Sequence, residues 1–195
     1  MPDTTHRPDK RYITPSELLQ DAYALAFQVY HSGYRPDYII GVWRGGTPVA
    51  IALHELLWIM GIHADHMAVR ARSYSGIGKR NSTIELDGME WLLQRAQPDQ
   101  SVLVVDDVHD TGVTLQYIVE TLGQQCQQGA PQVRVATPWY KPHNNQTPSA
   151  PDYYLHSTAQ WLVFPHELQG LTREELAAGK PELANFIDQL PQTLP

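Results

Sequence analysis

The sequence predicts an α/β protein in which a parallel β-sheet is flanked by helices. Residues 37–43 and 102–105 are short apolar runs, and each is followed by a small-residue turn and then by a helical pattern. Repeated alternation of this kind is typical of parallel sheets with helices on both faces. Such sheets bind ligands beyond the C-terminal ends of their strands, so the two turns are the candidate functional segments.

The chain has the size of one domain. Its 195 residues, 42% hydrophobic and 18% charged, suit a globular protein that buries roughly 70% of the surface exposed by its unfolded chain. We expect a single domain over residues 1–195. Its core is predicted over about 14–142, and a small hood, or appendage, over about 143–195 together with the N-terminal residues.

The charge balance limits the classes of partner. With 14 Lys and Arg against 21 Asp and Glu, the formal charge of −7 disfavours nucleic acid and anionic membrane surfaces. We see neither the apolar core of a secretory signal nor a window approaching the roughly 18 apolar residues of a membrane span, so we expect a cytoplasmic location. Cys126 is the one cysteine, which excludes an intrachain disulfide, and we interpret it as a small apolar residue.

Local signals place the elements of the first half. The run Thr14-Pro15-Ser16-Glu17 has the pattern of a capping box with Pro at the first helical position, and Gly33 marks the end of that helix. A second helix is predicted from Thr47-Pro48 to about Met60. A strand at 65–72 leads into a loop of Gly, Ser and basic residues over 73–83, which we expect to be mobile.

The second half follows the same logic. Residues 85–97 fit either a short helix or a strand pair. A helix is predicted from about Thr114 to Gln127, and strands at 133–136 and 153–155. A second capping box begins at Thr172, and Gly179 can close its helix.

Three carboxylates and a small-residue turn follow the strand at 102–105. Main-chain N–H groups at a turn into a helix favour an anion, and the turn Asp110-Thr111-Gly112-Val113-Thr114 adds two hydroxyl donors, so a phosphate monoester is the natural guest. Repulsion between the adjacent Asp106 and Asp107 must be relieved by a cation, by hydroxyl donors or by protonation of one of them. A ligand with a phosphate, vicinal hydroxyls and Mg²⁺ would relieve it.

Residues 104–114, VVDDVHDTGVT, closely resemble the phosphoribosyl diphosphate (PRPP) binding motif of the type I phosphoribosyltransferases. That motif consists of a hydrophobic strand, two acids, two spacers and then Asp-Thr-Gly-x-Thr. The resemblance implies that Asp106 and Asp107 engage the ribose hydroxyls and a Mg²⁺-linked shell. It implies a phosphate cradle made of Asp110, Thr111, Gly112, Val113 and Thr114.

Two other segments resemble parts of the same family. Arg44-Gly45-Gly46 is similar to the pyrophosphate loop, where glycines let the main chain approach the ligand and Arg donates hydrogen bonds. Ser73-Tyr74 and the loop after them resemble the flexible lid that closes over the reaction centre and excludes water. His109 fills a spacer that is often aliphatic in purine enzymes, and Trp43 is bulky for a pyrophosphate loop, so the roles of both stay open.

The resemblance also implies a purine acceptor. Lys141 occupies the position of a lysine that donates to the purine O6 in 6-oxopurine phosphoribosyltransferases, and Trp161 resembles the tryptophan that stacks on the base. Taken without the resemblance, Trp161 is better interpreted as a core aromatic. The main chain of Leu162 would face the group at purine C2, and Glu167 aligns with an acid that binds a second Mg²⁺.

These residues lead to the expectation of Mg²⁺-dependent transfer of the 5-phosphoribosyl group from PRPP to a 6-oxopurine, with release of pyrophosphate. Guanine, xanthine and hypoxanthine are not ranked by the sequence. Asp110 is the candidate general acid or base, and we expect a dimer or tetramer. Two alternatives stay open: a regulator with this fold that senses PRPP or a nucleotide without useful catalysis, and transfer to a non-purine base.

Overall fold

The computed structural model describes residues 10–74 and 83–191. Contacts between residues divide the chain into two compact units. The smaller contains Met1–Leu18 and Gln160–Pro195, and the larger contains Leu19–Ala159. The sequence predicts a core that ends at about residue 142. The larger unit extends further, because strand β8 (Tyr153–Ser157) pairs with β7 (Gln132–Tyr140) of the sheet.

The larger unit is built on one sheet with strand order β4-β3-β2-β5-β7-β6, and β8 also pairs with β7. All of its neighbouring strands run parallel except β3 and β4, which pair antiparallel. The remaining strands are β2 (Tyr38–Trp43), β3 (Asp65–Tyr74), β4 (Thr83–Asp87), β5 (Ser101–Val105) and β6 (Val108–His109). The predicted α/β class with a mostly parallel sheet is confirmed.

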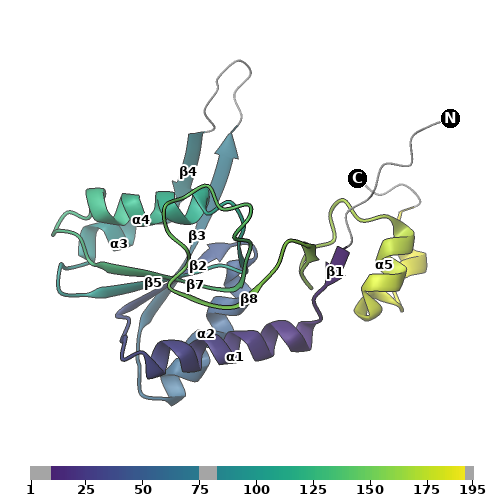
Figure 1. Ribbon diagram of the computed structural model, residues 1–195, viewed down its shortest axis with the longest axis horizontal. Helices are drawn as coiled ribbons and strands as arrows, with labels where there is room; N and C mark the ends of the chain where they lie inside the picture. Colours follow the sequence, from purple (N-terminus) through teal and green to yellow (C-terminus); the bar gives the residue numbers. More distant parts are fainter. Residues whose placement is uncertain (1–9, 75–82, 192–195) are drawn as a thin grey trace. The chain divides into compact units, whose positions relative to one another are not determined.

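Helices cover both faces of this sheet. Figure 1 shows α3 and α4 on one side and α1 and α2 on the other. Apolar side chains at helical spacing on α4 pack with strand residues such as Ile40 and Val104 in one buried cluster, which also holds Leu92 of α3. The helix bounds are α1 (Pro15–His31), α2 (Gly46–Ile59), α3 (Glu90–Arg95) and α4 (Val113–Gln125).

The predicted helix signals are present at α1. The N–H of Thr14 donates to Glu17 Oε2 at 2.8 Å and the N–H of Glu17 donates to Thr14 Oγ1 at 3.1 Å, which is the capping box. Gly33, with φ of 80°, follows the helix end as expected. Cys126 lies at the C-terminal end of α4, half-buried against the apolar cluster, and burial raises the pKa of its thiol.

Two sequence interpretations change. The segment 85–97 is neither helix nor strand pair alone, because it contains the end of β4 and then α3. The predicted loop over 73–83 was wrong at its ends: Ser73 and Tyr74 belong to β3 and pair with Ile84 and Thr83 of β4. Antiparallel pairing extends both strands into the polar segment, and the remainder of the expected lid lies outside the described residues.

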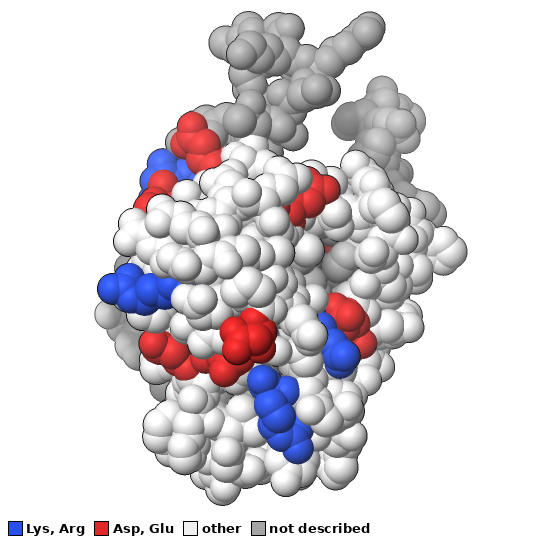
Figure 2. All heavy atoms as spheres, turned by 90° about the vertical axis from the view of Figure 1, so that its left-hand side faces the viewer, with Lys and Arg blue, Asp and Glu red and all other residues white. Residues whose placement is uncertain are grey.

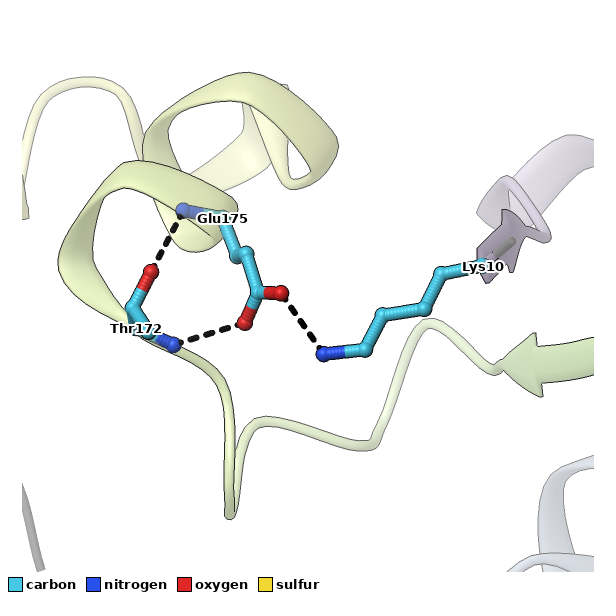
Figure 3. Close-up of polar contacts among 3 residues, drawn as sticks. All are labelled: Lys10, Thr172 and Glu175. Carbon is cyan, nitrogen blue, oxygen red and sulfur yellow. Dashed lines mark hydrogen bonds and ion pairs between the residues drawn. The ribbon is translucent and has the colours of Figure 1, made fainter. Parts of the chain in front are cut away.

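The smaller unit contains strands β1 (Lys10–Tyr12) and β9 (Trp161–Val163), which pair in parallel, and helix α5 (Arg173–Gly179). Two short 3₁₀ turns follow at Pro181–Leu183 and Ile187–Gln189. The predicted capping box is formed by Thr172 and Glu175, and Glu175 also accepts a hydrogen bond from Lys10 Nζ at 2.7 Å (Figure 3). One acid thus ties the start of α5 to β1.

The charged side chains are mixed in sign. On the face drawn in Figure 2, Lys and Arg lie among Asp and Glu, and the described residues form no continuous basic patch there. Among the described residues, no helix has the length and apolarity needed to cross a membrane.

Candidate functional site

The acidic residues follow the C-terminal end of β5, in the centre of the sheet. Parallel pairing of β5 with β2 places Val105 beside Gly41, so the segments that follow the two strands emerge at the same edge. Asp107 is buried, and its N–H donates to Asp106 Oδ1 at 3.0 Å. Burial and the neighbouring Asp107 carboxylate raise the pKa of Asp106 well above its usual range. The pair therefore favours a proton or a cation.

The glycine turn lies directly against these acids. A Cβ atom on Gly45 would stand 1.9 Å from Asp107 Oδ2, and one on Gly46 would stand 2.3 Å from the Val105 carbonyl oxygen. Both positions thus require glycine because of close approach. Arg44 and Trp43 precede the turn with exposed side chains, joined by a cis peptide bond. The structure therefore brings the predicted pyrophosphate loop against the predicted ribose and metal residues.

The predicted phosphate turn leads into α4. Gly112 precedes the helix with φ of 77°, a left-handed conformation that favours glycine. Gly112 at the N-cap has no side chain, and the N–H of Val113 donates to Thr111 Oγ1 at a long 3.5 Å, so the first N–H groups of the helix can serve an anion. A cavity of about 100 Å³ opens at the turn, lined by Asp106, Val108, Asp110, Thr111, Gly112, Thr114 and Leu115.

His109 lies beneath this turn. Its side chain is 4% exposed, and its Cε1 would be 2.4 Å from a Cβ on Gly112. The ring packs edge-on against Tyr140, with 5.2 Å between centroids. Burial lowers the pKa of His109, and its Nδ1 has no hydrogen-bond partner within the described parts of the chain. The imidazole therefore fills the space under the phosphate turn as a neutral group.

Asp110 and Lys141, predicted separately, form an ion pair. Lys141 follows β7, is buried, and donates from Nζ to Asp110 Oδ2 at 2.9 Å. Asn144, which the sequence analysis missed, donates from Nδ2 to the other oxygen, Oδ1, at 2.7 Å. Burial acts to raise the pKa of Asp110, but the hydrogen bonds from Asn144 and Lys141 and the lysine charge lower it below its ordinary value. Asp110 is thus held as a carboxylate.

The only local signal for Asn144 was its place in a turn-prone run. Residues 141–146, KPHNNQ, contain Pro and Asn after a strand, which is typical of a turn. The turn closes through the N–H of Asn144, which donates to the Lys141 carbonyl at 3.0 Å. That turn returns the amide toward Asp110, 34 positions earlier in the chain.

Three predicted residues belong to the smaller unit. Trp161 is 56% exposed at the start of β9, so the core interpretation of this side chain is wrong. Leu162, next on the strand, is buried. Glu167 accepts a hydrogen bond from the N–H of Phe164 at 3.1 Å, and the buried Lys180 donates from Nζ to the Phe164 carbonyl. Contact of Trp161 and Leu162 with a base, and of Glu167 with a metal, stay predictions.

The acid pair suits a magnesium ion. Mg²⁺ takes oxygen ligands and is usually bound by one or two carboxylates together with substrate phosphates and water. Asp106 and Asp107 supply such carboxylates, and the burial that raises the pKa of Asp106 favours a compensating cation. Among the described residues, no three His, Cys, Asp or Glu gather as a complete protein metal cage. The remaining ligands would come from the substrate and from water.

The phosphoribosyl transferase domain family matches residues 13–169. The crystal structure of a purine phosphoribosyltransferase from Pyrococcus horikoshii Ot3 is similar, with 30% sequence identity, a TM-score of 0.66, and coverage of 84% of this chain and 97% of that chain. No protein with a curated description matches the chain in sequence.

Two more distant structures share the fold alone. A hypothetical protein from Neisseria gonorrhoeae with bound ppGpp is 22% identical, with a TM-score of 0.69 and coverage of 91% of this chain and 98% of that chain. A xanthine-guanine-hypoxanthine phosphoribosyltransferase from Helicobacter pylori is 19% identical, with a TM-score of 0.61 and coverage of 80% and 92%. The family match over most of the chain, together with the acidic turn, the glycine turn and the phosphate turn at one sheet edge, shows that this chain belongs to the phosphoribosyltransferase family.

Proposed function

We propose that the protein transfers the 5-phosphoribosyl group from PRPP to N9 of a 6-oxopurine and releases pyrophosphate, with Mg²⁺ as cofactor. The observation that carries the proposal is the ion pair between Asp110 of the phosphate turn and Lys141 at the end of β7. It sets a hydrogen-bond donor and an acceptor side by side at the turn expected to hold the ribose phosphate. A 6-oxopurine offers the complementary pair, an acceptor at O6 and a donor at protonated N7.

The main chain and Arg44 would hold the anionic ends of PRPP. The N–H groups at the start of α4 suit the 5′-phosphate, because Gly112 at the N-cap has no side chain and the Thr111 hydroxyl accepts from the Val113 N–H at a long 3.5 Å. Arg44 and the main chain of Gly45 and Gly46, where no side chain separates the backbone from a ligand, suit the pyrophosphate, on which charge develops as its bond to C1′ breaks. When bound, Mg²⁺ would add positive charge beside that leaving group.

Asp110 would accept the proton that the purine base loses from N7. As the purine N9 forms a bond to C1′, the bond from C1′ to the pyrophosphate oxygen breaks and the purine gains positive charge. A proton on N7 then becomes acidic enough to move to a carboxylate. Asp110 is available as that carboxylate, because Asn144 and Lys141 lower its pKa and keep it ionised. Lys141 would donate to O6, and the sugar would pass through an oxocarbenium-like state.

The test is release of pyrophosphate from PRPP and Mg²⁺ in the presence of guanine, xanthine or hypoxanthine. Turnover with at least one of these bases is expected, and it should stop when EDTA removes Mg²⁺ and return when Mg²⁺ is restored. Adenine and uracil serve as matched bases that lack the O6 acceptor of a purine. Turnover with uracil alone would favour the non-purine alternative, and PRPP binding without turnover on any base would favour the regulatory one.

We also propose that the protein associates with itself through the outer face of α2. Ile51, Trp58 and Ile59 are exposed on this helix, Ile59 by 81%. A groove of about 310 Å³ lies beside them, lined by residues of α2, β2 and β3. The exposed apolar side chains and the groove lie on the same face, so a two-fold arrangement would place the side chains of each copy in the groove of the other. Glu55 of α2, which lines the groove, is exposed and adds a charge beside the apolar side chains.

A further inference from the structure

We propose that Asn144 is a positioning residue that keeps the Asp110 carboxylate oriented when Lys141 turns from Asp110 to the purine base. The proposal rests on the proposed function, because it assigns a role within that site. Asn144 lies outside the PRPP motif. It and Lys141 each donate a hydrogen bond to a different oxygen of the Asp110 carboxylate.

Each oxygen of Asp110 has its own donor. Lys141 Nζ contacts Oδ2 at 2.9 Å, and Asn144 Nδ2 contacts Oδ1 at 2.7 Å. The two donors differ in chemistry, because the lysine ammonium is a mobile charge on a flexible stem, whereas the asparagine amide is neutral and sits on a short side chain. A base that accepts from Lys141 would therefore release Oδ2 and leave Oδ1 held.

The main chain fixes the Asn144 amide relative to the phosphate turn. The N–H of Lys141 donates to the His109 carbonyl at 2.9 Å, and the N–H of Gln146 donates to the Thr111 carbonyl at 2.9 Å. These bonds bracket Asn144 on one segment and Asp110 on the other. The segment 141–146 is thus held against the turn on both sides of the Asp110–Asn144 hydrogen bond, so the amide is preorganised before any ligand enters.

Without Asn144, the carboxylate would depend on Lys141 alone. Among the described residues, Lys141 and His109 act on the charge of Asp110, and Asp106 lines the same cavity. Once Lys141 donates to a base, its hydrogen bond to Asp110 is lost. The hydrogen bond from Asn144 would then still favour the ionised form of Asp110. Loss of the amide should therefore disturb base binding and the protonation of Asp110, and should leave the phosphate contacts of PRPP intact.

The experiment compares Asn144→Leu with Asn145→Leu. Asn145 is a matched control on the same loop, because its amide donates to Tyr140 Oη at 3.2 Å and to the Ser149 carbonyl at 3.1 Å, and not to Asp110. For Asn144→Leu we expect kcat/KM for the purine to fall about 10–100-fold, the size of losing a hydrogen bond to a charged group, with KM for PRPP changed less than about twofold. The acidic limb of the pH profile should move to higher pH in Asn144→Leu only.

Asn144→Gln keeps the amide and should restore part of the activity and of the pH profile. Equal losses in the Asn144 and Asn145 variants, or an unmoved pH profile in Asn144→Leu, would overturn the proposal, because a loop held only for stability would behave that way. Titration of the Asp110 carboxyl by ¹³C NMR needs no turnover. It should show a higher pKa in Asn144→Leu than in the wild type, and an unchanged pKa would overturn the proposal. If the wild type turns over no purine, the proposed function fails separately.

Discussion

Replacing Gly112 by Ala tests the packing of the phosphate turn against His109. The new Cβ would lie 2.4 Å from His109 Cε1 and 2.8 Å from Thr147 Oγ1, and the residue would keep a φ of 77°. A left-handed conformation costs an L residue about 1–2 kcal/mol. Overpacking against the buried imidazole adds about 1–3 kcal/mol. We therefore expect Gly112→Ala to lower the free energy of unfolding by about 2–5 kcal/mol.

The measurement is urea unfolding together with PRPP binding by calorimetry. Gly123→Ala is the matched control, because Gly123 lies within α4 and a Cβ atom at that position would have no packing neighbour within 4 Å. Alanine there should stabilise the protein by about 0.5–1 kcal/mol. A turn that shifts to relieve the contact misaligns its N–H groups, and PRPP affinity should fall about 10–100-fold in Gly112→Ala.

A double-mutant cycle separates the two contributions. In a His109→Ala background the contact with the imidazole is gone, so the cost of Gly112→Ala should fall toward the conformational part, about 1–2 kcal/mol. The contact with Thr147 Oγ1 remains in both backgrounds, because this hydroxyl donates to Asn145 Oδ1 at 2.8 Å and to the Ser149 carbonyl at 3.0 Å. A wild-type urea midpoint for Gly112→Ala, or an equal cost with and without the His109 side chain, would show that His109 does not constrain this turn.

Two further predictions concern charge and association. Asp106→Asn should stabilise the metal-free protein at pH 7 and weaken Mg²⁺-dependent PRPP binding. Because the folded-state pKa of Asp106 is raised, its ionisation opposes folding above its unfolded pKa, so the gain in urea stability should vanish as the pH falls toward about 4. An equal gain in stability at about pH 7 and about pH 4 would contradict this prediction. Ile59→Asp should convert a self-associated protein to a smaller species in light scattering, because it places a charge in the apolar contact between copies; an unchanged mass would exclude this face as the interface.

The family motif and the helix starts could be predicted because their signals are local. The two capping boxes each span four residues, and their hydrogen bonds at Thr14 and Thr172 lie where the spacing placed them. The signal of the Asp-Thr-Gly turn is also local. The turn leads into α4 where the sequence predicted a helix, and Gly112 within it has a left-handed conformation that glycine favours. Ser73 and Tyr74 failed this test, because antiparallel pairing with β4 overrides their loop-like composition.

The sequence by itself therefore determined the sheet class, the acidic turn and the residue types that could meet a phosphorylated sugar. Tertiary structure alone decided which of them meet. Parallel strands bring their C-terminal ends to one edge, and this places Gly45 against Asp107 and Lys141 against Asp110, 31 positions apart. It also added Asn144, whose partner is chosen by how the loop after β7 packs on the turn after β5, and no spacing rule encodes that contact.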